Sequence, residues 1–229
     1  MNLRLHRQAL RAAIVGLAII AIVTVSKGGA PLADEHAPAV SASESLRMLL
    51  EGNQRFIDGE MTHPNQMPAR RIETAKGQHP FAAILTCSDS RTPPEVLFDR
   101  GLGDIFVVRV AGNVADQVVI ESLDYAATHL GVRLLMILGH RKCGAVTAAV
   151  LGHEEPGDVG PMLSELRPAV EATQGKPGDP VENAIRENVK LVVTKLADSP
   201  ELAAMVKSGD LKVIGGIYDL GSGQIEMLK

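Results

Sequence analysis

The sequence predicts an α/β fold in which a central, mostly parallel β-sheet is flanked by helices. Apolar runs of strand length recur along the chain, at 81–86, 105–110, 134–138 and 211–214, and amphipathic stretches lie between them. Strands that alternate with helices are typical of a parallel sheet covered on both faces. The chain has 229 residues, of which 45% are hydrophobic, so we expect one domain with a substantial core.

The N-terminus has a different character. Three arginines within the first eleven residues precede an uncharged, mainly apolar stretch at 12–25. This order resembles a secretory signal peptide, and the stretch is shorter than the ~20 residues that a spanning helix needs. Small residues on either side of Pro38 offer a cleavage site, and a weaker one lies near Ala30. We therefore expect residues 1–39 to be an export segment with its linker, and residues 40–229 to form the folded domain.

Export places the protein in the periplasm, an oxidising compartment. The alternative is an N-terminus that is not cleaved and stays as an anchor, which would be the protein's only contact with a membrane. The formal net charge is −4 and no basic stripe stands out, so nothing supports a nucleic-acid partner.

A helical arm is expected before the sheet. Ser41 and Glu44 have the spacing of a capping box, and apolar residues at helical spacing follow them, namely Leu46, Leu49, Leu50 and Ile57. The segment 61–78 lacks periodicity, so it is expected to form an irregular extension of this arm.

Further helices are expected at 118–130, 145–151 and 180–196. Gly131 can end the first of them, as glycine often does after a helix. Asp179 and Pro180 begin the last one as a cap followed by a first-turn proline. Near the end of the chain, the glycines on either side of Ser222 predict the turn of a hairpin.

Two polar blocks follow two of the predicted strands. They are Cys87-Ser-Asp-Ser-Arg91 and Gly139-His-Arg-Lys-Cys-Gly144. Sites in open α/β sheets form beyond the carboxyl ends of the strands, so both blocks are expected at the same edge of the sheet. Cys87, His140 and Cys143 would then form a set of ligands that suits tetrahedral zinc. A helix that starts just after Cys143 would also favour ionisation of its thiol.

Each of these residues has an ordinary structural explanation as well. A single cysteine after a strand is most often a small buried hydrophobe, and a single histidine there is most often a hydrogen-bonded structural residue. The chain has two cysteines, and export would allow a Cys87–Cys143 disulfide. The occurrence of all three residues at one sheet edge favours a metal site over these alternatives.

Asp89 and Arg91 are two residues apart, so in an extended loop they point the same way and can pair. The pair could simply shape the turn. Alternatively, the guanidinium positions a carboxylate beside the metal, where it can ligate zinc or accept a hydrogen bond from water. Zinc lowers the pKa of bound water from 15.7 to about 7. Such a site suits attack on a small neutral electrophile such as carbon dioxide.

The segment 79–115 and the block 138–146 strongly resemble the β-class carbonic anhydrases, and the resemblance extends from about Ser43 to Leu228. It implies their α/β fold and one Zn²⁺ per subunit, held by Cys87, His140 and Cys143. It also implies that Asp89 either fills the fourth position or leaves it to water while paired with Arg91, these two being the catalytic residues. The implied activity is that of a lyase, the reversible hydration of carbon dioxide to bicarbonate and a proton.

The resemblance also assigns a substrate pocket. Gln78 would donate a hydrogen bond to a substrate oxygen, Phe106 and Tyr125 stand where the family has pocket aromatics, Ala111 stands where many members have Val, and the backbone at Gly144 can approach the substrate. His129 matches a residue proposed as a proton shuttle in some members. The family completes this pocket at a dimer interface, which implies a homodimer or a multiple of dimers. Ordinary core packing is the alternative for Phe106 and Tyr125.

One departure from the family narrows the expectation. Members with a second, inhibitory bicarbonate site carry Trp where this chain has Ile84, and this chain has no Trp. Arg109, which also belongs to that inhibitory site, is present but is common in the wider family. Two other functions stay open: hydrolysis of carbonyl sulfide or carbon disulfide on the same zinc site, and zinc or bicarbonate binding without catalysis.

Overall fold

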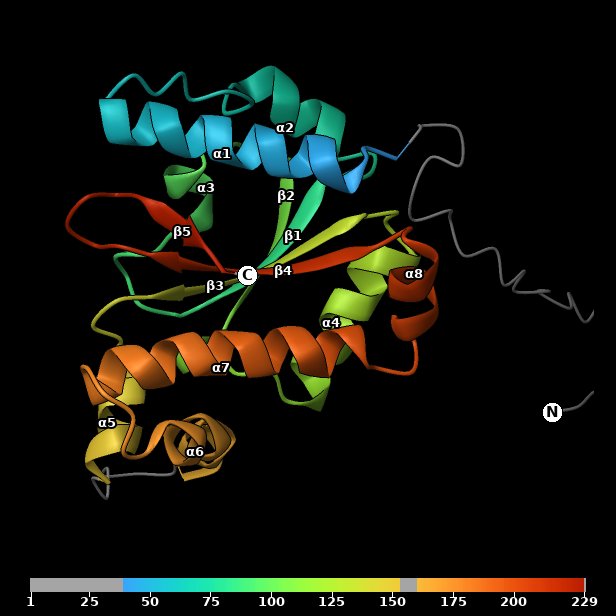
Figure 1. The fold of residues 1–229 in the computed structure, drawn as a ribbon. Helices are drawn as coiled ribbons and strands as arrows, with labels where there is room; N and C mark the ends of the chain where they lie inside the picture. Colours follow the sequence, from blue (N-terminus) through green and yellow to red (C-terminus); the bar gives the residue numbers. More distant parts are fainter. Residues whose placement is uncertain (1–38, 153–159, 229) are drawn as a thin grey trace, which may run out of the picture. The chain divides into compact units, whose positions relative to one another are not determined.

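The computed structural model describes residues 39–152 and 160–228, which contain a five-stranded sheet of order β2-β1-β3-β4-β5 (Figure 1). The strands are β1 (Ala82–Thr86), β2 (Ile105–Arg109), β3 (Leu134–His140), β4 (Lys212–Tyr218) and β5 (Ile225–Met227). The first four are parallel, and β5 runs antiparallel to β4. This confirms the predicted α/β class, and the β4–β5 pair is the predicted hairpin.

Helices cover both faces of the sheet (Figure 1). Their bounds are α1 (Ala42–Asp58), α2 (Pro68–Thr74), α3 (Pro94–Leu97), α4 (Gln117–Thr128), α5 (Gly144–Leu151), α6 (Gly160–Thr173), α7 (Pro180–Ala197) and α8 (Ala203–Ser208). Side chains alternate between the faces of a strand, so Ala83 and Leu85 face the core with α4 and α7, whereas Ala82 and Ile84 face the core with α1 and α3. The core with α4 and α7 is built from aliphatic side chains and the two cysteines, whereas the core with α1 and α3 also contains Phe81, Phe98 and Tyr218.

The helix starts follow the caps expected from the sequence. The Ser41 hydroxyl accepts a hydrogen bond from the backbone N–H of Glu44 at 3.2 Å, and Asp179 caps α7 by accepting from Val181 and Glu182. The predicted capping box is only half formed, because the Glu44 carboxylate accepts from Arg47. Gly131 has the left-handed φ of +71° expected near a helix end, but it comes two residues after the cap residue of α4.

The irregular arm expected at 61–78 is partly wrong, because it contains the two-turn helix α2. Every residue of α2 is exposed or half-buried, so the helix has no apolar stripe that periodicity could reveal. Residues 1–38 of the export segment and linker predicted at 1–39 lie outside the described residues. Within 39–152 and 160–228, none of the helices has the length and apolar content that crossing a bilayer requires.

A buried carboxylate fixes the segment that precedes α2. The Asp99 side chain is fully buried and accepts hydrogen bonds from Arg55 Nε at 2.6 Å, from the Thr62 backbone N–H and hydroxyl at 3.0 and 2.9 Å, and from the His63 N–H at 2.8 Å. Burial alone would raise the pKa of Asp99, but these hydrogen bonds outweigh it and hold the pKa well below its ordinary value.

We therefore expect Asp99→Asn to lower the free energy of unfolding by about 3 kcal/mol at pH 7, because the carboxylate loses its charge-assisted bonds. Asn tolerates the positive φ of this residue, so the backbone need not change. A carboxyl with a depressed folded pKa stabilises above its unfolded pKa, so the difference from wild type should shrink as the pH falls below about 4. Urea unfolding of both proteins at several pH values measures this, and a difference that does not depend on pH would contradict it.

Candidate metal centre

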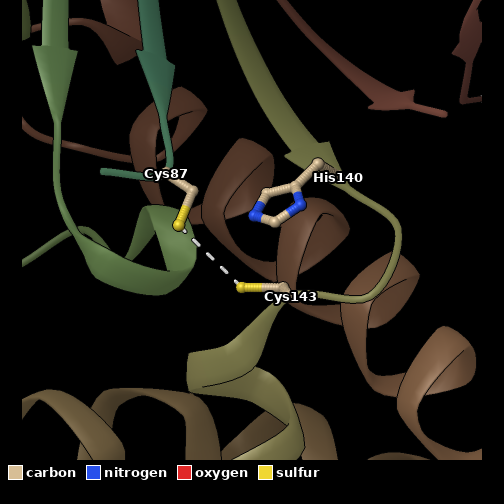
Figure 2. A group of neighbouring side chains, drawn as sticks. All are labelled: Cys87, His140 and Cys143. Atoms are coloured by element: carbon tan, nitrogen blue, oxygen red, sulfur yellow. Dashed lines mark hydrogen bonds between the residues drawn. The ribbon is translucent and has the colours of Figure 1, made fainter. Parts of the chain in front are cut away.

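Three side chains converge at the carboxyl end of the sheet (Figure 2). Cys87 directly follows β1, His140 is the last residue of β3, and Cys143 is the N-cap of α5. Strands β1 and β3 are parallel neighbours, with Thr86 opposite Leu138, so their ends meet. The ligand atoms of all three residues lie within 4.8 Å of one another, and all three residues are buried. The sequence prediction that brings these residues together is confirmed.

The geometry fits a zinc ion rather than a disulfide. The two sulfur atoms are 3.9 Å apart, whereas a disulfide requires about 2.05 Å. Tetrahedral zinc with bonds of about 2.3 Å places two thiolates at about 3.8 Å. His140 Nδ1 lies 2.9 Å from the Arg141 carbonyl oxygen, and its Nε2 is buried without a hydrogen-bond partner among the described residues. A ligating histidine that donates its other ring N–H to a carbonyl is typical of zinc sites.

The pKa values of the two thiols are shifted in opposite directions. The hydrogen bond from Cys143 lowers the pKa of Cys87 to about 4, and the backbone N–H of Gly112, 3.3 Å from the Cys87 sulfur, contributes in the same direction. The neighbouring Cys87 thiolate, together with burial, raises the pKa of Cys143 far above its usual range. A cation between the sulfurs would allow both to be thiolates, because a coordinating thiol is deprotonated by the metal.

Asp89 and Arg91 stand beside this set as a bidentate ion pair. Arg91 Nε donates to Oδ1 at 2.9 Å and its terminal nitrogen to Oδ2 at 2.7 Å, and the Arg91 backbone N–H also donates to Oδ1. Arg91 therefore holds the pKa of Asp89 well below its usual range, so the carboxylate is ionised at neutral pH. Asp89 Oδ2 is 3.8 Å from His140 Nε2. The predicted pairing is confirmed, and the carboxylate lies next to the atom that faces the metal position.

Two residues that sequence reasoning did not assign to this site hold the loop that carries Cys87 and Asp89. Arg109, opposite Thr86 in the sheet, donates to the carbonyl oxygens of Cys87 at 3.2 Å and Asp89 at 2.5 Å. The buried hydroxyl of Thr92 donates to the same two carbonyls at 3.2 and 3.0 Å. The sequence did carry one signal for Arg109, because an arginine at the end of a predicted neighbouring strand can reach the loop that follows β1.

The predicted pocket residues form two groups. Gly144 follows Cys143, and Ala111 precedes the Gly112 N–H that binds the Cys87 sulfur, so both lie near the ligands. Phe106 of β2 pairs with Ala83 of β1. Ala83 is four residues before Cys87, so Phe106 lies roughly 13 Å along the strand direction from Cys87.

In the second group, the rings of Phe106, Tyr125 and His129 lie close to one another. The rings of Phe106 and Tyr125 are 6.4 Å apart, and those of Tyr125 and His129 are 5.1 Å apart. Gln78 is exposed. Within one subunit, therefore, Phe106 is set back along the sheet from Cys87, with Tyr125 beside it.

Comparison with known proteins agrees with this site. A family model described as "Carbonic anhydrase" matches residues 82–225. The chain is 36% identical over 192 residues to carbonic anhydrase 2 of Mycobacterium tuberculosis, which covers 82% of this chain and 93% of the relative. It is 36% identical over 186 residues to the carbonic anhydrase of Mycolicibacterium smegmatis, covering 79% of this chain and 90% of the relative.

Solved structures extend the likeness to the fold. A β-carbonic anhydrase of Aspergillus fumigatus is 33% identical, with a TM-score of 0.64, and the match covers 80% of this chain and 90% of that one. One of two tetrameric β-carbonic anhydrases from Sordaria macrospora is 26% identical, also with a TM-score of 0.64, over 80% of this chain and 96% of that one. Family model, relatives, fold and ligand set agree, and the chain belongs to the β-carbonic anhydrase family.

Proposed function

We propose that this chain is a zinc-dependent carbonic anhydrase that reversibly hydrates carbon dioxide to bicarbonate and a proton. The observation that carries the proposal is the Asp89–Arg91 ion pair, whose carboxylate lies 3.8 Å from the metal-facing nitrogen of His140. A purely structural zinc site needs neither residue of this pair. The pair therefore supports catalysis over zinc binding alone.

Cys87, His140 and Cys143 would hold the metal. Bound there, zinc supplies the Lewis acidity that lowers the pKa of water from 15.7 to about 7. Asp89, held ionised by Arg91, can accept a hydrogen bond from the attacking water and orient it toward carbon dioxide. Arg109 and Thr92 keep Asp89 in place through its carbonyl oxygen. The alternative role of Asp89 as a fourth ligand would require it to give up Arg91, which engages both of its oxygens.

The activity is tested by stopped-flow carbon dioxide hydration with the zinc-loaded protein, the chelated protein and the protein reconstituted with zinc. Activity should follow zinc content. Carbonyl sulfide and carbon disulfide turnover should be measured on the same samples, because their hydrolases share the ligand set. Faster turnover of either substrate than of carbon dioxide would assign the chain to that reaction instead.

We propose that the active unit is a dimer or a multiple of dimers. Phe106 pairs with Ala83, four residues before Cys87, and Tyr125 lies beside it, while the family resemblance places these rings and Gln78 at the metal site of a neighbouring subunit. On α2 and the residue before it, Ile72 and Met67 are 65% and 70% exposed, which offers apolar surface to a second copy. Light scattering after size exclusion tests this, and a fully active monomer would contradict it.

We also propose that the protein is exported to the periplasm, with residues 1–39 acting as export segment and linker. The basic and apolar pattern before residue 26 supports this. The intact mass of the protein recovered from the periplasmic fraction would locate a cleavage site. A full-length mass in the membrane fraction would favour an uncleaved anchor.

We expect bicarbonate to act on this enzyme as a simple product inhibitor, without cooperativity. The inhibitory site of related enzymes uses a Trp where this chain has Ile84, which is fully buried in β1 beside Met136 and Leu138. Arg109, which also belongs to that site, donates here to backbone carbonyls of the Cys87 loop. Initial hydration rates measured against bicarbonate concentration test this, and a steep sigmoidal loss of activity would contradict it.

A further inference from the structure

A short turn beside the metal ligands donates a hydrogen bond to one of them. The backbone N–H of Gly112 lies 3.3 Å from the Cys87 sulfur. Gly112 and the following Asn113 both have left-handed backbone conformations, with φ of +68° and +44°. A left-handed conformation is uncommon for a residue other than glycine and persists only where its surroundings fix it. The orientation of this N–H therefore depends on whatever holds the turn.

A buried side chain from a distant helix holds it. Asn188, on α7, is 3% exposed, and its Nδ2 donates to the carbonyl oxygen of Gly112 at 2.9 Å. Only the Cα of Gly112 separates this carbonyl from the N–H that faces Cys87. Because glycine has the softest backbone dihedrals, the carbonyl must be anchored from outside if the N–H is to stay aimed at the sulfur.

Helix α7, which carries Asn188, packs closely against the sheet. Next to Asn188, Val189 packs against Gly139 and Gly215, where a Cβ on either glycine would lie 2.7 Å from a Val189 methyl group. These two glycines let α7 approach β3 and β4 closely, and β3 ends in His140. Helix α7 is therefore seated against the strand that supplies one zinc ligand, and it reaches from there to the turn that contacts another.

We propose that Asn188 is a positioning residue of the zinc site: it orients Gly112 so that its N–H binds the Cys87 thiolate, and it thereby sets zinc affinity. The inference rests on the proposed zinc enzyme. Groups that hydrogen-bond to metal ligands, and the residues that orient them, typically change metal affinity 10- to 100-fold when they are lost. Asn188 contacts neither metal ligand nor substrate, so its influence passes through Gly112.

The test is Asn188→Leu in the full-length protein, since Leu has a similar size and no donor. Zinc dissociation is followed by transfer to a chromophoric chelator, and Co²⁺ replaces zinc for absorption spectra. We expect zinc to dissociate about 10- to 100-fold faster and the thiolate-to-cobalt charge-transfer band to shift. Asn188→Ala, which removes the donor without adding bulk, serves if the leucine variant does not fold, and it should show the same changes.

Asn53→Leu is the matched control. Asn53 is 4% exposed and its Nδ2 donates to the carbonyl oxygens of Leu97 and Gly223, on the other side of the sheet. It should lower thermal stability but leave the cobalt spectrum and zinc dissociation unchanged. The inference is overturned if the Asn188 variants keep the wild-type spectrum and rate, or if Asn53→Leu changes them equally. A wild-type protein that binds no zinc would overturn the metal site itself, which separates the two failures.

Discussion

Replacing Cys87 with Ala should abolish stoichiometric zinc binding and reduce carbon dioxide hydration at least ~10³-fold. Only His140 and Cys143 of the three ligands would then remain, and a catalytic zinc site normally needs three protein ligands. Zinc content after gel filtration and stopped-flow hydration rates measure the two effects. Cys143→Ala should behave in the same way, because the two sulfur atoms, 3.9 Å apart, would bind the same metal ion.

Ser88→Ala is the control for this loss, since Ser88 is exposed in the same loop and next to Cys87. It should keep wild-type zinc content and activity. One zinc per subunit in Cys87→Ala would remove Cys87 from the ligand set and leave the disulfide and structural alternatives to be reconsidered.

Asp89→Ala should keep its zinc and lose about 10²- to 10⁴-fold in kcat, the usual contribution of a group that positions a proton in the reaction. The metal is retained because Cys87, His140 and Cys143 form the cluster without Asp89. Arg91 holds the pKa of Asp89 well below its usual range, so Asp89 stays ionised as the pH falls from 8 to 5. A change in wild-type activity within that window must then come from another group. Metal analysis and a pH–rate profile test both statements.

Ser90→Ala supplies the comparison, because Ser90 is exposed between Asp89 and Arg91. It should retain full activity. Asp89→Asn, which keeps the size but not the charge, should lose activity as Asp89→Ala does. Full activity in either Asp89 variant would show that the carboxylate has no part in the reaction.

The metal ligands could be predicted from the sequence because topology brings them together. Buried parallel strands read as continuous apolar runs, and the polar residues that follow such runs must meet at one edge of the sheet. Cys87 and Cys143 are 56 residues apart, yet each lies at the end or start of an element that the apolar pattern marks. Spacing therefore predicted the parallel strands and the meeting of these three residues, while the family resemblance supplied their roles.

The surroundings of the site carried weaker signals. Phe106 and Tyr125 are half-buried beside each other, and no periodicity says whether such rings line a pocket or fill a core. The sequence does carry a weak signal for Asn188, because this polar residue lies on the apolar face of α7, three residues after Ile185 and four before Val192. A polar residue on an apolar face needs a buried partner. Its partner, however, is 76 residues away on a backbone carbonyl, which no sequence pattern reveals.

The origin of the three ligands also couples the whole fold to metal supply. Because Cys87, His140 and Cys143 come from two strands and a helix start, the high-affinity site exists only in the folded chain. A ligand that binds only the folded state shifts the folding equilibrium by mass action. Each tenfold rise in free zinc above the Kd should therefore add about 1.4 kcal/mol to the free energy of unfolding. The concentration of free zinc in its compartment should therefore set the folded fraction of this protein as well as its metal-loaded fraction.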